Sequence, residues 1–466
     1  MNHIKRPGRT GQIKRFCARF AQGAGSALGR VIPQKDLCQW IAEGSGNCRE
    51  RIYGPLQTLM LFIEQVLGAD QSCQDAVARG VSQRVGLGQS PSSLNNGPYC
   101  KARARLALSL VERLGREIGE RLLASQPEAW RWRGREVKLI DGTTASMPDT
   151  PANQAEFPQS RMQKPGLGFP LIRLVAVISL SCGAVLGWAT GPCRGKKTGE
   201  TALLRQLAHG LHPGDIVIGD RYFCGYFLLV WLIRQGVDVV VRQHQTRHTD
   251  FRRGKRLGTK DHVVAWGRPQ RPTWMDAATY VTMPETLTLR EVRIGGLTLV
   301  TSLREAGEVS KQELLTLYHA RWQVELDLRS IKTVMQMDVL RCKSPDMVKK
   351  EIAVHLLAYN LVRAVMAQAA FLGHILPRQL SFKAALQLIR AFEENLRHAP
   401  RGRLALCRAC LLAGISQVRL PLRPDRVEPR AIKRRHKPTP YLTRPRQVLK
   451  TAILKQQKVL HREFLR

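Results

Sequence analysis

The chain has 466 residues, 44% of them hydrophobic, which is enough to bury a sizeable core and to exclude a disordered polypeptide. Its 74 Lys and Arg residues against 36 Asp and Glu residues give a formal net charge of +38. Such a charge predicts a polyanionic partner, and nucleic acid is the commonest one. The basic residues are spread along the whole chain rather than gathered on one amphipathic helix, which argues against a membrane surface.

The cysteines and the N-terminal segment indicate the compartment. Eleven cysteines stand at irregular spacing, and an odd number argues against a disulfide framework, so we expect a reducing cytoplasm. Cys407 and Cys410 form a CxxC pair in an apolar run without a second Cys or His pair, which favours two buried helix thiols over zinc. The N-terminus is basic but lacks the apolar core of a secretory signal, and an organellar transit peptide stays an alternative.

The N-terminal region, residues 1–125, is expected to be helical and to contribute to binding DNA. Apolar residues recur at three- and four-residue spacing over 56–67 and 102–123. The intervening stretch 86–98 is rich in Gly, Ser, Asn and Pro and predicts a loop. Three cations in 99–105 open the next helix, as either a solvated basic face or a phosphate contact.

Residues 126–243 change to strands. We expect strands at 137–141, 171–180, 184–189, 215–220 and 237–243, with helices at 198–211 and 226–234. The punctuated apolar run from 171 to 188 indicates a hairpin rather than a membrane span. This order of elements predicts an α/β protein with a ribonuclease H-like catalytic core.

Residues 244–309 interrupt that core. They begin with a basic loop and continue as short β runs such as 279–283 and 297–303, so a β-rich insertion is expected. The core resumes over 310–366 with a long helix that starts at the capping box Ser310–Glu313 and runs past Lys332. Helices are also expected at 346–371, mostly within the second part of the core, and at 381–397. The latter belongs to a helical and basic C-terminal region, 367–466, for dimerisation or DNA contact. Residues 419–450 are expected to be extended.

Three acidic residues carry the chemistry. Asp141 and Asp220 each end a buried strand, although turns also favour Asp for conformational reasons. On the long helix, Tyr318, Arg321, Glu325 and Lys332 are spaced so that they project onto one face. The alternative for Arg321 and Glu325 is an ordinary structural ion pair.

Three carboxylates meeting at one rim could hold two Mg²⁺ ions, with Mn²⁺ as a substitute, and cut a phosphodiester. The Tyr318 hydroxyl, the Arg321 fork and the Lys332 ammonium are suited to holding phosphate charge. Four other acids lie near the same blocks and are not expected to bind metal; they are Asp149, Glu156, Asp215 and Asp327.

The sequence resembles bacterial insertion-sequence transposases of the IS-four family, which are relatives of the transposon five and ten enzymes. The resemblance is carried by the spacing Tyr318-x2-Arg321-x3-Glu325-x6-Lys332 and by two earlier motifs, Ile-Asp141-Gly-Thr-Thr and Gly-Asp220-Arg-Tyr. The resemblance covers about residues 136–366. It implies metal-dependent cut-and-paste transposition of double-stranded DNA, cleaved at the element's terminal inverted repeats and joined to a target. It further implies a DNA hairpin and a homodimer in a synaptic complex. It assigns the transposon-end phosphate to Tyr318, Arg321 and Lys332, and suggests a base-stacking aromatic in the insertion, for which Trp266 and Trp274 are candidates.

Two rival functions stay open at this point. One is a catalytically degenerate relative that keeps only the basic, DNA-binding surface. The other is a glycosidase with paired carboxylates, which would act without metal and would not need a charge of +38.

Overall fold

The computed structural model describes residues 39–464, apart from 41–42, 44–51, 196–197 and 422–441. Its centre is a nine-stranded sheet in the order β3-β2-β1-β4-β5-β9-β8-β7-β6. The strands are β1 (Val137–Ser146), β2 (Leu171–Ser179), β3 (Val185–Pro192), β4 (Ile216–Gly219), β5 (Asp238–Arg242), β6 (Lys255–Gly258), β7 (Asp261–Gly267), β8 (Thr286–Ile294) and β9 (Leu297–Thr301). Strands β1, β4 and β5 are parallel, and the other pairs are antiparallel.

Helices cover both faces of the first five strands. The elements before the insertion are α8 (Glu200–Leu204), the 3₁₀ turns η2 (Arg205–Gly210) and η3 (Arg221–Phe223), and α9 (Tyr226–Arg234). Leu139 of β1 packs in one hydrophobic cluster with α13 (Pro345–Leu372), whereas the next residue, Ile140, packs in the other with α8 and α9. Burial on both faces explains why these strands read as continuous apolar runs rather than as alternating ones.

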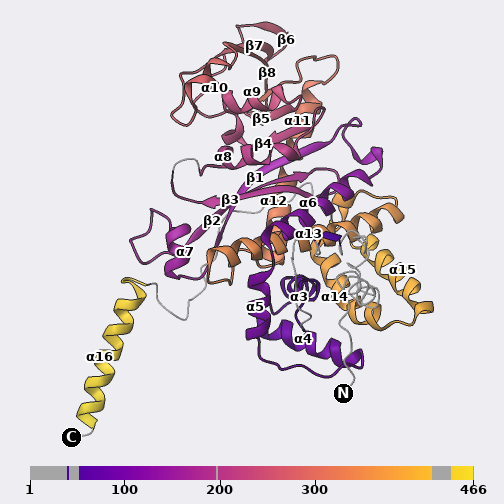
Figure 1. Cartoon of the computed structure of the whole chain (residues 1–466). Coiled ribbons are helices and arrows are strands. Elements are labelled where there is room, and N and C mark those ends of the chain that lie inside the picture. Colours follow the sequence, from indigo (N-terminus) through magenta and orange to yellow (C-terminus); the bar gives the residue numbers. More distant parts are fainter. Residues whose placement is uncertain (1–38, 41–42, 44–51, 196–197, 422–441, 465–466) are drawn as a thin grey trace.

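The β-rich insertion is part of the same sheet and not a separate barrel or sandwich. Strand β9 pairs with β5 through Val240–Thr301, and β8, β7 and β6 then continue outward to the upper end of Figure 1. The strand predicted at 279–283 is wrong, because this segment lies largely in the helix α10 (Ala277–Val281). The Asp276 side chain accepts a hydrogen bond from the Thr279 amide, and such an N-cap overrides the local β propensity.

The long helix that was predicted to start at Ser310 and to run past Lys332 is broken. It consists of α11 (Lys311–His319), α12 (Trp322–Arg329) and a π-helical turn, η4 (Ser330–Val334). The capping box Ser310–Glu313 is present as predicted. At the break, the Arg321 amide donates to the Tyr318 carbonyl oxygen and the Val324 amide to that of Arg321. These hydrogen bonds join residues three apart, so the backbone is locally 3₁₀ rather than α-helical.

The N-terminal helices form a layer beneath the sheet in Figure 1. They are α3 (Pro55–Leu67), α4 (Cys73–Gly86), α5 (Gly97–Arg105) and α6 (Leu108–Ala124). The predicted helix 102–123 is divided at Leu106, whose backbone is extended. Within 99–105, Arg103 is buried over the Phe62 ring, so it is no surface phosphate contact. Residues 1–38 lie outside the described residues.

The C-terminal region contains α14 (Phe382–His398), α15 (Arg401–Gln417) and α16 (Arg446–Phe464), the last of which extends away from the body in Figure 1. Helix α13 is long and apolar enough to cross a membrane, but 94% of its apolar window is buried inside the protein, as in a core helix. The prediction of two buried thiols on α15 is wrong, because Cys410 is exposed. Much of the predicted extended segment 419–450 lies outside the described residues, and its end belongs to α16.

Candidate functional site

Asp141 and Asp220 lie at the same rim of the sheet. Strand β4 pairs with β1 only as far as Leu139 and ends at Gly219, whereas β1 continues to Ser146. Asp141 therefore lies on an edge of β1 that β4 no longer covers. Asp220 follows β4 directly and caps η3, its Oδ1 accepting from the Tyr222 amide at 2.8 Å. The charge of Asp220 reaches Asp141 and contributes to raising its pKa. The prediction that Asp141 ends its strand is wrong, because β1 continues to Ser146.

The surroundings of Asp141 disfavour the ionised form of its side chain. Partial burial raises the pKa of Asp141 to about 6, the Gly142 amide opposes this at 2.8 Å, and the charge of Asp220 adds to the rise. A carboxylate held in this way, with a second one beside it, is stabilised by an incoming cation.

Arg321 connects the first carboxylate to the third. Its Nη2 donates to Glu325 Oε1 at 2.7 Å, and its charge also acts on Asp141. Tyr318 is buried near Arg321, and burial raises the pKa of its hydroxyl, a rise that Arg321 and Arg242 oppose. Arg242, at the end of β5, is a further cation of this rim that the sequence analysis did not single out.

Lys332 is not brought to this group by any contact in the described residues. It lies half-buried on the π-helical turn η4, beyond the end of α12. Charge interactions and a hydrogen bond relate Asp141 to Asp220 and Arg321, and Arg321 to Tyr318 and Glu325.

The three carboxylates are chemically suited to a divalent ion, although they do not surround one common point. Asp141, Asp220 and Glu325 offer the hard carboxylate oxygens that Mg²⁺ prefers, on an edge of the sheet that like charges share. Within the described part of the chain, no three His, Cys, Asp or Glu side chains stand close enough to ligate one ion together. The Glu325 carboxylate is held by Arg321 instead.

Two of the competing acids have structural partners. Asp215 pairs with the buried Lys138 ammonium at 2.5 Å. Asp327 is completely buried and accepts from Arg378 Nη1 at 2.7 Å, from Tyr359 Oη at 2.9 Å and from Arg363. These pairs leave neither carboxylate available to a metal.

The two tryptophans of the insertion are occupied by other contacts. Trp266 is only 3% exposed, donates its ring N–H to Glu291 at 2.7 Å and lies under the Arg247 guanidinium. Trp274 is 39% exposed and has Arg205 over its ring.

Two aromatic residues beside the rim were missed by the sequence analysis. Tyr222, just after Asp220, is 65% exposed, and Trp322, next to Arg321, is 52% exposed. Their adjacency to the motif residues was the available signal.

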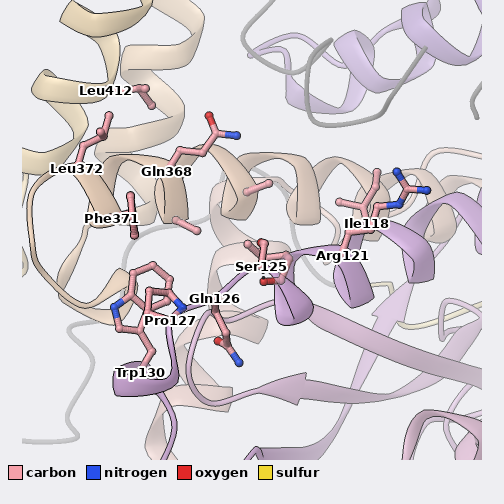
Figure 2. Close-up of a pocket in the computed structure, with 13 residues that line it drawn as sticks. Ile118, Arg121, Ser125, Gln126, Pro127, Trp130, Gln368, Phe371, Leu372 and Leu412 are labelled. Carbon is pink, nitrogen blue, oxygen red and sulfur yellow. Dashed lines mark hydrogen bonds between the residues drawn. The ribbon is translucent and has the colours of Figure 1, made fainter. Parts of the chain in front are cut away.

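An open pocket of about 550 Å³ lies elsewhere, between α6, α13 and α15 (Figure 2). Its lining includes Trp130, Gln368, Phe371 and Leu412, and none of the predicted site residues. It is therefore distinct from the carboxylate rim.

Residues 132–361 match the family model described as "Transposase DDE domain". The transposase InsG of insertion sequence element IS4 from Escherichia coli (strain K12) is 30% identical over 354 residues, which cover 72% of this chain and 77% of that protein. The putative transposase InsZ of the same organism is 27% identical over 29% of this chain and 45% of its own length.

Among solved structures, a piggyBac transposase synaptic complex with hairpin DNA aligns with 85% of this chain and 84% of its own, at 10% identity and a TM-score of 0.42. The segment matched by the family model contains Asp141, Asp220 and Glu325, as well as the complete sheet. By the family model and the identity to InsG together, the chain belongs to the DDE transposases of the IS4 family.

Proposed function

We propose that this transposase is catalytically active and moves an insertion sequence by cutting and joining double-stranded DNA. The observation that carries the proposal is the convergence of Asp141 and Asp220 at one rim, with Arg321 linking them to Glu325. A relative that had lost catalysis would have no need to keep like charges together at an energetic cost.

The catalytic unit of this proposal is a ribonuclease H-like core, formed by residues 126–243 and 310–366 around the insertion 244–309. Its support is the order of β1 to β5, with three antiparallel strands followed by two parallel ones and helices on both faces. Residues 1–125 and 367–466 would bind DNA, and the latter would also hold a homodimer in a synaptic complex. The work of the enzyme would take place in the cytoplasm.

Asp141, Asp220 and Glu325 would hold two Mg²⁺ ions, or Mn²⁺ in their place. When bound, such ions activate the attacking oxygen and stabilise the leaving one in phosphodiester cleavage. The protein's part is to hold three oxygen donors on rigid elements: Asp141 on β1, Asp220 at the end of β4, and Glu325 on α12. For Glu325 to become a ligand, its carboxylate must exchange Arg321 for the cation.

Tyr318, Arg321 and Lys332 would hold the phosphate of the transposon end. An Arg321 fork released from Glu325 can bind two phosphate oxygens in parallel, and Arg242 adds charge at the same rim. The exposed rings of Tyr222 and Trp322 offer surfaces on which a base could stack, as excision through a DNA hairpin would require.

The experiment is to incubate the protein with DNA that carries the inverted repeats flanking its gene, with Mg²⁺ and without it, and to map the products. We expect nicked, hairpin and joined species only with the metal. Tight DNA binding without any product, in Mg²⁺ and in Mn²⁺, would instead identify a degenerate DNA-binding relative. Products of a single unpaired end at rates linear in protein concentration would contradict the dimer.

A further inference from the structure

Two cysteines from distant parts of the chain face one buried arginine. Arg103 of α5 is only 5% exposed. Its Nη1 donates to the Cys73 sulfur at 2.9 Å, and its Nη2 donates to the Cys342 sulfur at 3.3 Å. Cys73 is the first residue of α4, whereas Cys342 lies in the segment between η4 and α13. Because Nη1 and Nη2 belong to one planar guanidinium, both sulfur atoms lie beside the same small group.

The two segments that carry these cysteines are also held together by other hydrogen bonds. Just before α4, the Gln71 side chain donates from Nε2 to the Met335 carbonyl oxygen at 2.8 Å. In return, the Gln336 side chain donates from Nε2 to the Ala69 carbonyl oxygen at 3.3 Å. The start of α4 is therefore fixed against the segment that precedes α13, and the two thiols are neighbours because of this packing.

The charge of Arg103 is not balanced by a carboxylate at contact distance in the part of the chain that the structure describes. Its guanidinium lies over the Phe62 ring at 3.9 Å, and its buried Nε has no hydrogen-bond partner there. Glu351 acts on Arg103 only through its charge. A buried cation without a counter-ion is costly, and the atoms that face this one are the two sulfurs. A thiolate at one of them would neutralise it.

The two sulfurs have different surroundings. Cys73 accepts the shorter hydrogen bond from Arg103 and a second one from Gln65 Nε2 at 3.8 Å, at the N-terminus of a 14-residue helix. Such donors stabilise negative charge on sulfur and make it a nucleophile. Burial raises the pKa of the Cys342 thiol, and the charge of Glu351 adds to the rise, so Cys342 keeps its proton. Both cysteines are partly exposed, within reach of a small oxidant.

We propose that Cys73 and Cys342 form an oxidation site, at which hydrogen peroxide converts the two thiols into a disulfide. This inference goes beyond the proposed function and does not depend on the ion site. The Cys73 sulfur attacks one peroxide oxygen: an S–O bond forms, the O–O bond breaks, and the second oxygen takes a proton and leaves as water. The Cys342 sulfur then attacks the Cys73 sulfur, and its proton goes to the departing hydroxyl, which leaves as a second water. Two thiols are oxidised, and one peroxide is reduced to two waters.

The new bond would join α4 covalently to the segment before α13, and thus the N-terminal helices to the core. Arg103 is a positioning residue for this reaction, since it holds both sulfurs and favours the negative charge on one of them. Cys100 of α5 also contacts Cys73 but is exposed, and Arg103 donates no hydrogen bond to it in the described chain. The geometry therefore favours Cys342 as the partner of Cys73.

The test treats the reduced full chain with equimolar hydrogen peroxide at neutral pH, alkylates the remaining thiols and maps the peptides by mass spectrometry. We expect a linked Cys73–Cys342 peptide as the main disulfide product. Cys73→Ser and Cys342→Ser should each abolish it, and Cys342→Ser should leave Cys73 as a sulfenic acid that dimedone traps. Cys410→Ser, which removes an exposed thiol of α15, is the matched control and should leave the linked peptide unchanged.

Arg103→Gln removes the shared charge and should slow formation of the disulfide roughly ten-fold or more. Thermal melts show whether this variant folds; if it does not, the two serine variants decide alone. The inference is wrong if no disulfide forms, if Cys73 pairs with Cys100 instead, or if the chain unfolded in guanidinium gives the same linked peptide equally fast. None of these results bears on DNA cleavage, so the proposed function would stand.

Discussion

Glu325 and Asp327 stand two residues apart on α12 and have opposite surroundings. Glu325 is partly exposed at the rim, with one ion pair to Arg321, whereas Asp327 is completely buried between Arg363, Arg378 and Tyr359. The helix turns about 200° between them, so the two carboxylates lie on different faces of α12, and that of Asp327 contacts Tyr359 and Arg363 of α13. Two acidic side chains on one helix thus have different surroundings.

The difference lies in how charge is balanced. At Asp327 two guanidinium groups neutralise one buried carboxylate, which makes the cluster a structural tie between α12, α13 and the turn that follows α13. At the rim, burial raises the pKa of Asp141 to about 6, and the charge of the neighbouring Asp220 adds to this rise. Under the proposed function, a bound cation would neutralise this negative charge, which lowers the stability of the metal-free protein.

The largest expected effect is on the rate of DNA strand cleavage. Asp141→Asn, Asp220→Asn and Glu325→Gln should each lower strand cleavage on the order of a thousand-fold or more, because each removes a donor for the ions that stabilise the transition state. DNA binding, measured by gel shift, should stay within a few-fold, since affinity rests on many phosphate contacts. Full cleavage by any one of the three variants would falsify its assignment.

The second-largest effect is a loss of stability expected when Asp327 is removed from its ion pairs with Arg363 and Arg378. Asp327→Ala should lower the free energy of unfolding by about 3–5 kcal/mol, because it leaves Arg363 and Arg378 buried without their shared carboxylate. Denaturant titration measures this, with Asp338→Asn on the exposed surface as the control. A loss of cleavage without a loss of stability in Asp327→Ala would mean that Asp327 belongs to the catalytic rim after all.

A smaller effect is expected from the phosphate-holding cations. Arg321→Ala and Lys332→Ala each remove a charge-assisted contact of roughly 1.5–3 kcal/mol, or about ten- to a hundred-fold in rate. The first nick should survive weakly, whereas hairpin formation and joining, which need the strand end in line, should fall further. Gels that separate the three products decide the matter. If both variants slowed nicking, hairpin formation and joining equally, or slowed none of them, Arg321 and Glu325 would form only a structural ion pair.

The smallest effect concerns pH. The pKa of Asp141 in the folded chain, about 6, is above its ordinary value of 3.8, so folding is penalised once this group ionises. This penalty is absent at low pH and grows as pH rises through the interval between the two values. Metal-free Asp141→Asn should therefore gain stability over the unaltered protein, on the order of 1–2 kcal/mol at neutral pH and little near pH 4. A gain that is independent of pH would show that Asp141 is not desolvated at the rim.

Asp220 could be placed directly after β4 because a short apolar run ends there, whereas Asp141 lies inside β1, which continues through less apolar residues to Ser146. Helix α9 was predicted to the residue for a similar reason, as its apolar pattern is bounded by Gly225 and Gly236. The break at Arg321 could not be predicted, since no Pro or Gly marks it.

The ion pairs of Asp327 indicate which part of the chain can fold as an independent unit. The segment matched by the family model ends at residue 361, yet Arg363 and Arg378 lie beyond it. A catalytic segment ending at 361 would bury a carboxylate that faces no cation, so it cannot be exchanged between relatives like an independent module. The C-terminal region is instead tied to α12 through Asp327, so a substitution of Arg378 should be tolerated only together with a matching change on α12.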